Sequence, residues 1–156
     1  AYLSTLLRYW EEEVEGEAYF RALADQLSDR QQKEKMTLLA EVERHTAAIT
    51  RPLIEKYGLV PQPESALAAA GREAAADAPG WEALLAEMRA SYPGYISAFE
   101  ALAALAPAAD RPLLDRMTEH EVVALAFLEA ETQGALDSTA PLLSFLSTPV
   151  ATSQAA

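Results

Sequence analysis

Four glutamates of this 156-residue chain fall on helical stripes that are otherwise apolar. With about 100° between successive residues, two glutamates share one face of the first helix with apolar side chains. That face carries Leu6, Trp10, Glu13, Glu17, Phe20 and Ala24. Glu43 lies within the apolar arc of the next helix, and Glu121 is central in the seam of a later one. Because burial penalises a charged carboxylate, each needs a metal ion, a proton, or an arginine or hydroxyl partner.

The depths of these carboxylates along their helices also agree. At about 1.5 Å per residue, Glu13 lies roughly 18 Å before the first interhelical turn and Glu43 roughly 20 Å after it. In an antiparallel pair these heights place the two carboxylates side by side. By the same calculation, the heights of Tyr92 and Glu121 along their helices agree within about 6 Å. Three inward carboxylates at similar depth cannot all stay ionised without cations; for Glu13 and Glu17 the alternative is a solvated helix edge.

The supply of histidine and cysteine limits the kind of metal site. The chain has two histidines and no cysteine, which excludes disulfides, thiolate zinc sites and iron–sulfur ligation. Carboxylate and imidazole ligands favour hard or borderline cations. His45 and His120 fall at the edges of their apolar arcs. Each can complete a site if its helix rotates; otherwise each is a half-exposed polar side chain.

Helical periodicity dominates the chain, and no alternating pattern predicts a strand. Ser28, with Gln31 three residues later, resembles a capping box that opens the second helix. Gly58 is expected to end that helix, which Pro52 should kink near its end. The expected helices span about 3–24, 28–58, 81–106 and 110–134, with a short helix at 140–146.

The segment 59–80, rich in proline and alanine, is expected to be a long crossover with a short helix at 64–70 as an option. FRALA at 20–24 recurs as FEALA at 99–103, which predicts two related helix pairs. Four-helix bundles of the ferritin-like type have this connectivity. A chance match between alanine-rich helices is the alternative. Residues 1–146 would form the bundle and 147–156 a loose tail.

Two segments carry a resemblance to a known family. EEEVEGEAYFRALA at 11–24 and LLAEVERHTAAI at 38–49 resemble the rubrerythrin-like branch of the ferritin-like superfamily. The resemblance implies an all-α, ferritin-like four-helix bundle with iron or manganese as cofactor. In such bundles two helices each give one glutamate and two give a Glu-x-x-His motif. Glu13 matches the first-helix glutamate, and Glu43 and Glu121 match those of the second and fourth helices.

The chain departs from that pattern at three ligand positions. Thr46 and Ala124 stand where the two motif histidines are expected, and Tyr92 replaces the third-helix glutamate. Tyr92 and Thr46 are therefore expected beside the ligands and not on the metal. A complete di-iron site needs about six protein ligands.

The sequence thus assigns a partial ligand set. The favoured metal ligands are Glu13, Glu43 and Glu121, and the further candidates are Glu17, His45 and His120.

The net charge narrows the possible partners. A formal charge of −12 argues against binding to nucleic acid, which requires clustered lysine and arginine, and against attraction to anionic membranes. No apolar run is long enough to span a bilayer, and the first residues lack the features of a signal peptide. We therefore expect a cytoplasmic protein.

Three functional hypotheses remain open from the sequence. The first is a ferritin-like bundle with a degenerate or weak carboxylate metal site that binds iron, manganese or no metal. The second is an active di-iron or manganese carboxylate oxidase, which would need one of the histidines and a further acid such as Glu17. The third is a non-enzymatic helical module that dimerises through a bundle face. A homodimer is expected, and the sequence does not identify a small-molecule substrate.

Overall fold

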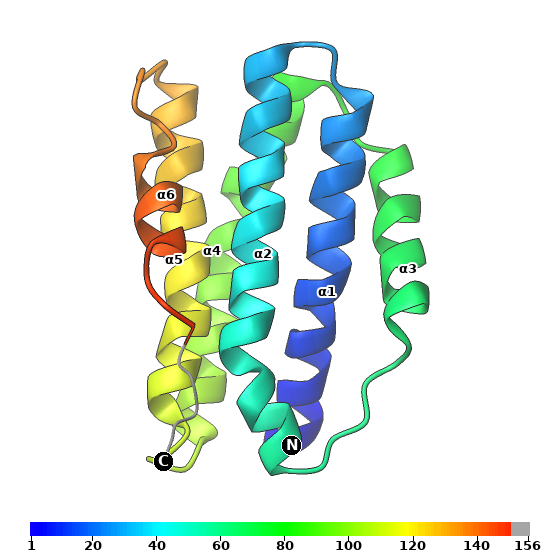
Figure 1. Ribbon diagram of the computed structural model, residues 1–156. Coiled ribbons are helices and arrows are strands. Elements are labelled where there is room, and N and C mark those ends of the chain that lie inside the picture. Colours follow the sequence, from blue (N-terminus) through cyan, green and yellow to red (C-terminus); the bar gives the residue numbers. More distant parts are fainter. Residues whose placement is uncertain (151–156) are drawn as a thin grey trace.

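The computed structural model describes residues 1–150 and contains only helices and loops over that range (Figure 1). The helices are α1 (Tyr2–Gln26), α2 (Arg30–Lys56), α3 (Glu64–Ala76), α4 (Trp81–Leu105), α5 (Arg111–Thr132) and α6 (Ala140–Leu146). The expected all-α class and the short helix at 140–146 are therefore confirmed. None of the helices in the described range combines the length and the apolar character needed to cross a bilayer.

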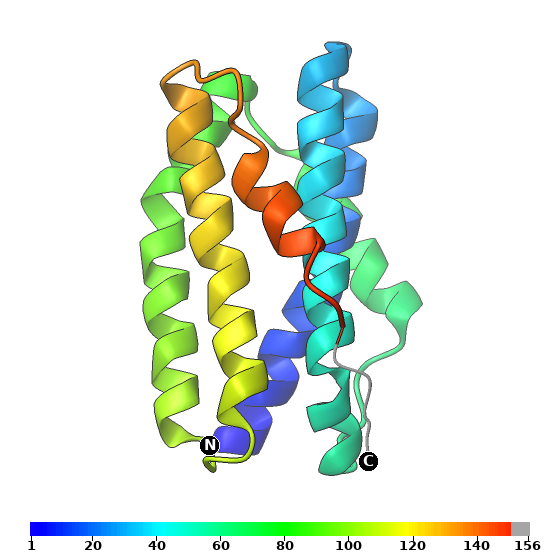
Figure 2. The same ribbon diagram turned by 60° about the vertical axis from the view of Figure 1, so that its left-hand side comes forward.

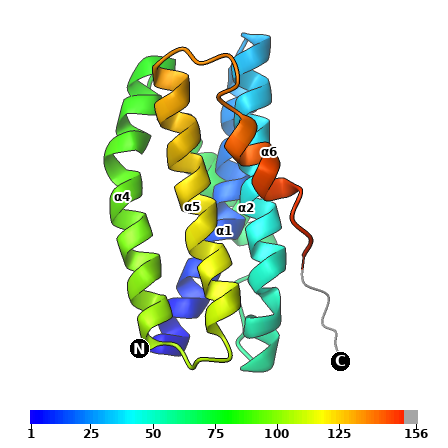
Figure 3. The ribbon, with the colours of Figure 1, turned by 90° about the vertical axis from the view of Figure 1, so that its left-hand side faces the viewer.

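The long helices lie in two pairs. α1 and α2 pack side by side and run in opposite directions, as do α4 and α5 (Figure 1). α5 packs against α2, and α1 meets α4 over a more limited contact, so the pairs face each other (Figure 2). α3 lies along α1 on the side away from α5, and α6 lies across α2 and α5 (Figures 1 and 3).

Two apolar clusters fill the space between the helices. One is built around Phe20, Leu39, Met88, Phe127 and Phe145. The other is built around Leu6, Trp10, Ile54, Leu102 and Met117. On α1 and α5 the residues of one cluster precede those of the other along the helix, and ionisable residues stand between them. The helices therefore bury a polar layer between two apolar layers.

The ends of α2 differ in detail from the sequence-based expectation. Asp29, and not Ser28, is the N-cap residue, and its carboxylate accepts a hydrogen bond of 2.9 Å from the Gln32 amide. An aspartate at this position also places negative charge at the positive end of the helix. The helix continues through Pro52 and ends at Lys56. Gly58 follows with φ of 60°, a left-handed conformation that glycine adopts readily.

The crossover holds a longer helix than predicted. α3 extends to Ala76 and not to residue 70, because Gly71 does not end it. Leu67, Gly71 and Ala75, spaced by four residues, form its buried stripe. A Cβ at Gly71 would overlap the main-chain carbonyl oxygen of Glu15 on α1. Gly71 therefore allows the backbones of α1 and α3 to approach closely.

The segment after α6 packs against the bundle. The Thr148 carbonyl oxygen lies 2.8 Å from His45 Nε2, and the Thr148 hydroxyl accepts a hydrogen bond from Arg116. Val150 packs against the first apolar cluster. The expectation of a loose tail is thus wrong for residues 147–150, and the remainder of that segment, 151–156, lies outside the described residues.

Asp110 joins three helix ends at one end of the bundle. Its buried carboxylate accepts hydrogen bonds from Tyr2 (2.8 Å), from Tyr57 (2.5 Å) and from the Lys56 ammonium (2.5 Å). Burial raises the pKa of this carboxyl, but the hydrogen bonds from Lys56, Tyr57 and Tyr2 together lower it by more. The pKa of Asp110 therefore lies below its ordinary value. These contacts tie the start of α1, the end of α2 and the start of α5 together.

The close approach of α3 predicts opposite effects for two glycine-to-alanine substitutions. Gly71→Ala is expected to lower the free energy of unfolding by about 1–3 kcal/mol, because its methyl group overlaps a main-chain oxygen. Gly94→Ala, where a Cβ would meet nothing within 4 Å, is expected to raise it by about 0.5–1 kcal/mol through helix propensity. Urea unfolding followed by circular dichroism measures both. Equal stability of the two variants would contradict the close α1–α3 packing.

The Asp110 contacts predict a pH-dependent loss of stability. A lowered folded-state pKa adds stability above the unfolded-state pKa of about 3.9, and this is lost as the pH falls through the folded-state value. Asp110→Asn is therefore expected to be less stable than the parent at pH 7, and the difference should shrink below about pH 4. Urea unfolding of both proteins across that range measures the difference. A constant difference would show that packing, and not charge, is responsible.

Candidate metal centre

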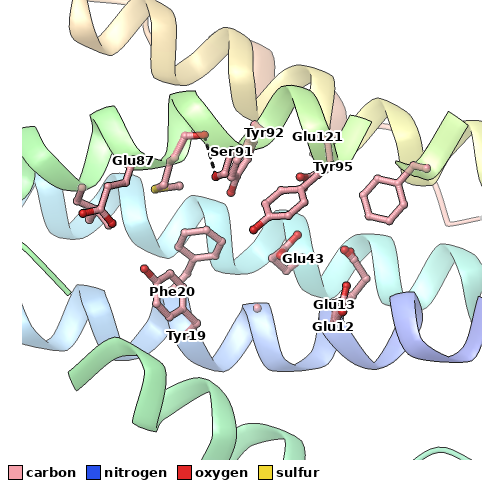
Figure 4. Close-up of a pocket in the computed structure, with 14 residues that line it drawn as sticks. Glu12, Glu13, Tyr19, Phe20, Glu43, Glu87, Ser91, Tyr92, Tyr95 and Glu121 are labelled. Carbon is pink, nitrogen blue, oxygen red and sulfur yellow. Dashed lines mark hydrogen bonds between the residues drawn. The ribbon is translucent and has the colours of Figure 1, made fainter. Parts of the chain in front are cut away.

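Four ionisable side chains from α1, α2 and α5 converge in the polar layer of the bundle. His120 Nε2 lies 2.8 Å from Glu13 Oε1, 3.0 Å from Glu43 Oε2 and 2.9 Å from Glu121 Oε1. Figure 4 shows Glu13 and Glu43 directed toward the same space. The three glutamates that the sequence favours thus lie together, and each has an oxygen within 3.0 Å of the same histidine nitrogen.

The cluster is almost completely shielded from solvent. Glu13 is 3% exposed, His120 0% and Glu121 6%. Glu43 is slightly more open, with 12% of its side chain exposed. Because buried charge interacts strongly with its neighbours, the protonation and pairing of these four groups must be considered together.

His120 occupies a different position from the one expected. The sequence places it at the margin of the α5 apolar arc, whereas the structure buries it, with its ring 5.6 Å from that of Phe99. His120 follows Met117 by three residues and precedes Ala124 by four, and both neighbours are buried. α5 therefore turns both His120 and Glu121 inward, and that spacing was the available sequence signal.

The second ring nitrogen of His120 fixes which tautomer the neutral ring adopts. Nδ1 contacts the main-chain carbonyl oxygen of Met117, which can only accept a hydrogen bond. The proton of a neutral ring therefore sits on Nδ1, and the Nε2 lone pair faces the carboxylates. Metal-bound histidines commonly have this arrangement, in which the non-ligating nitrogen donates to a carbonyl.

The contacts around Nε2 are not ordinary hydrogen bonds. Despite the short distances, neither His120 Nε2 nor Glu13 Oε2 has a hydrogen-bond partner among the described residues. A ring N–H points in one direction only, so it cannot serve three oxygens at once. Ligand atoms of Glu13, Glu43 and His120 lie within 4.8 Å of one another, so a cation among them could satisfy these atoms.

The shifted pKa values indicate that burial disfavours the ionised form of the carboxylates in the cluster. Burial raises the pKa of Glu13 to about 8, and the neighbouring Glu43 carboxylate adds to that shift. Burial also raises the pKa of Glu43. Burial lowers the pKa of His120, but the Glu13 and Glu121 carboxylates raise it by more, so the value lies well above normal. In the absence of a metal ion, protons must compensate the charge.

The ligand spacing fits a single metal ion. Donor atoms about 2.1 Å from an ion and at right angles to each other lie about 3 Å apart. The three contacts of 2.8, 2.9 and 3.0 Å at Nε2 agree with that spacing. Glu13, Glu43 and His120 each offer one ligand atom, and these atoms lie within 4.8 Å of one another. Carboxylate and imidazole donors suit Fe²⁺, Mn²⁺ or Zn²⁺.

The other candidate ligands lie outside the cluster. Glu17 forms a 2.9 Å ion pair with Arg21 on the same helix. His45 faces Thr148 on the opposite side of α2, and its ring lies 5.5 Å from that of Phe145. Glu17 and His45 are therefore corrected from possible ligands to side chains with partners elsewhere.

The two residues expected beside the ligands have different positions. The Thr46 hydroxyl donates to the Val42 carbonyl oxygen of its own helix, so it is satisfied without the cluster. Tyr92 is buried at the edge of the cluster, and burial together with the Glu121 and Glu43 carboxylates raises its pKa well above normal. Tyr92 is therefore a neutral neighbour of the ligands.

A cavity of about 520 Å³ adjoins the cluster between α1 and α4 (Figure 4). Glu13, Glu43 and Glu121 lie along its wall. Glu12 and Glu87 border it as well, although the sequence pattern places both away from the apolar seams. Glu87, Ser91 and Tyr95 are spaced by four residues, and this shared spacing was the overlooked signal. The candidate metal centre therefore has one open side.

Comparison with protein-family models, with curated proteins and with solved structures finds no match to this chain. The resemblance to the rubrerythrin-like branch thus stays a prediction. The function must be inferred from the geometry of the cluster itself.

The raised pKa values predict how the stability of the chelator-treated protein depends on pH. The Glu13 pKa rises from about 4.3 in the unfolded chain to about 8 in the folded protein. For His120, stability is fully present below the unfolded-state pKa of about 6.5 and is lost as the pH rises through the raised folded-state value. The folded state binds more protons in both cases, so the free energy of unfolding is expected to fall between pH 5 and pH 9.

Glu13→Gln is the diagnostic variant for this pH dependence. The amide cannot titrate, so urea unfolding with a chelator should give a flatter stability profile than that of the parent. Glu34→Gln, at an exposed position on α2, is a matched control that should keep the slope of the parent. Parallel profiles for Glu13→Gln and the parent would refute the raised pKa of Glu13.

Proposed function

We propose that this protein is a ferritin-like helical bundle that binds one divalent transition-metal ion through Glu13, Glu43 and His120, with Glu121 as a fourth ligand. The observation that carries the proposal is the convergence of three carboxylate oxygens within 3.0 Å of His120 Nε2 without hydrogen-bond geometry. A bound Fe²⁺ or Mn²⁺ supplies Lewis-acid and one-electron redox chemistry.

Each side chain has a distinct task in this proposal. The Met117 carbonyl holds His120 in the tautomer that presents the Nε2 lone pair to the metal. The Glu13 and Glu43 carboxylates supply negative charge that a divalent cation neutralises in place of protons. The unpartnered Glu13 Oε2 leaves a second oxygen available for bidentate binding.

The ligand count favours one ion over two. A di-iron site of the ferritin-like pattern uses about six protein ligands. The described residues place four candidates in the cluster, because Thr46 is hydrogen-bonded to its own helix and Tyr92 replaces a carboxylate. This supports the hypothesis of a degenerate di-metal site that keeps one metal position, with His120 in place of a motif histidine.

The helix arrangement supports the ferritin-like part of the proposal. α2 ends and α4 begins at opposite ends of the molecule, and the connection between them, which contains α3, spans its length (Figures 1 and 2). In ferritin-like bundles a single long crossover joins two antiparallel helix pairs. The open side toward the cavity further supports a functional site over a purely structural one, since structural metal sites are closed by protein ligands.

Metal content measured by mass spectrometry tests the proposal, and Gly16→Ala is the sharpest variant. A Cβ at Gly16 would collide with Glu43 Oε1 and push that carboxylate out of the cluster without removing a ligand. We expect about one equivalent of iron or manganese in the parent, and at least roughly tenfold weaker binding in Gly16→Ala and Glu43→Ala. The helical circular dichroism signal should be retained in both.

Gly94→Ala is the matched control, because it makes the same substitution within a helix at an open position. It should bind metal as the parent does. Unchanged metal binding in Gly16→Ala and Glu43→Ala would contradict the proposed ligand set. About two equivalents in the parent would instead support the di-iron or manganese oxidase.

A further inference from the structure

The cavity beside the metal centre has the size of a small-molecule site. Its volume of about 520 Å³ lies within the range of about 300–1,000 Å³ that is usual for ligand pockets. It extends along the gap between α1 and α4, from Tyr19 and Glu87 to the carboxylate cluster (Figure 4). A molecule in this gap would have one end beside Glu13 and Glu43.

The walls of the cavity combine aromatic rings with negative charge. Its aromatic lining residues are Tyr19, Phe20, Tyr92, Tyr95 and Phe99. The rings of Tyr92 and Tyr95 lie 5.6 Å apart at a tilt of 59°, so their faces are turned to different sides. The acidic lining residues are Glu12, Glu13, Glu43, Glu87 and Glu121. Within residues 1–150, no lysine or arginine lines the cavity.

The combination of aromatic rings and carboxylates favours a positively charged ligand. Aromatic faces attract ammonium groups through the negative potential of the ring. Carboxylates without lysine or arginine beside them repel phosphates and organic acids. The apolar lining residues Leu84 and Met88 suit the carbon skeleton of an organic molecule and not a hydrated inorganic ion.

The inner end of the cavity meets a buried carboxylate that has one unsatisfied oxygen. Glu13 lines the cavity, is 3% exposed and leaves Oε2 without a hydrogen-bond partner. Unpartnered buried carboxylate oxygens are rare, because each loses its hydration on folding. Because this oxygen is inaccessible to solvent, a metal ion in the cluster, and not a molecule in the cavity, would restore the lost interaction.

We infer that the cavity binds a small organic cation whose ammonium group sits among Tyr19, Tyr95 and Glu87 and whose carbon skeleton points toward the metal centre. The role of this molecule as a substrate rests on the proposed function, whereas its binding requires only the cavity. The aromatic rings recognise the ammonium group, and the acidic edge formed by Glu12 and Glu87 increases its local concentration.

Three molecules of nearly equal shape test the inference by isothermal titration calorimetry. Choline carries a quaternary ammonium group, 3,3-dimethylbutan-1-ol is its neutral counterpart, and 3,3-dimethylbutanoate carries a negative charge. Choline is expected to bind at least roughly tenfold more tightly than the neutral alcohol, and the anion should not bind. Equal affinity for choline and the alcohol, or no binding of choline, would overturn the inference.

Two glutamate variants locate the bound cation. Glu87→Gln removes a charge at the cavity edge, and we expect it to weaken choline binding at least roughly threefold. Glu100→Gln changes an exposed glutamate of the same helix that does not line the cavity, so it should bind choline like the parent. Equal choline affinity in Glu87→Gln and the parent would place the cation elsewhere and refute the inference.

The Mn²⁺-loaded protein separates this inference from the proposed function. Mn²⁺ at the centre should broaden the hydroxymethyl proton resonance of choline more than the methyl resonance of its ammonium group, and chelator treatment should remove the broadening. Metal binding without choline binding would refute the inference and leave the proposed function standing. Selective choline binding without metal binding would refute the proposed function and leave the binding of an organic cation standing. Choline binding without Mn²⁺-dependent broadening, or with stronger broadening of the methyl resonance than of the hydroxymethyl resonance, would overturn the orientation toward the metal.

Discussion

The burial of three carboxylates around one histidine is the constraint on which this structure depends. Each buried charge loses several kcal/mol of hydration, and only a proton, a salt partner or a metal ion restores it. Glu13, Glu43 and Glu121 come from three helices, and His120 Nε2 contacts all of them. The charge balance of this layer therefore links α1, α2 and α5 and sets their relative heights. In the proposed metal-bound protein, a divalent cation would compensate the same charge that protons compensate otherwise.

The remainder of the bundle keeps these helices in place. Apolar clusters lie on both sides of the polar layer, so a shift of one helix along its axis would bring a charged group into an apolar layer. Asp110 fixes three helix ends through hydrogen bonds, and Gly71 allows α3 to pack against the backbone of α1. The limited contact between α1 and α4 leaves the cavity that gives access to the centre.

Much of the cluster could be predicted from helical arithmetic, whereas its centre could not. The inward positions and similar depths of Glu13 and Glu43 follow from a period of 3.6 residues and a rise of about 1.5 Å, and the structure agrees with both. The rotation of α5 is less determined, because its apolar arc is broad and His120 and Glu121 are adjacent. Tertiary packing against Phe99 decides it and buries both. The length of α3 was underestimated because its last turns, including Gly71, are stabilised by close packing on α1, which the sequence pattern does not show.

The most direct test of the metal centre is anomalous X-ray diffraction from crystals of the Mn²⁺-loaded protein. Our account predicts a single strong peak about 2.0–2.3 Å from His120 Nε2 and from oxygens of Glu13 and Glu43. An ordered cluster without a peak, in which Nε2 donates a hydrogen bond to one carboxylate, would contradict it. The four groups would then form a proton-compensated polar layer and not a metal centre.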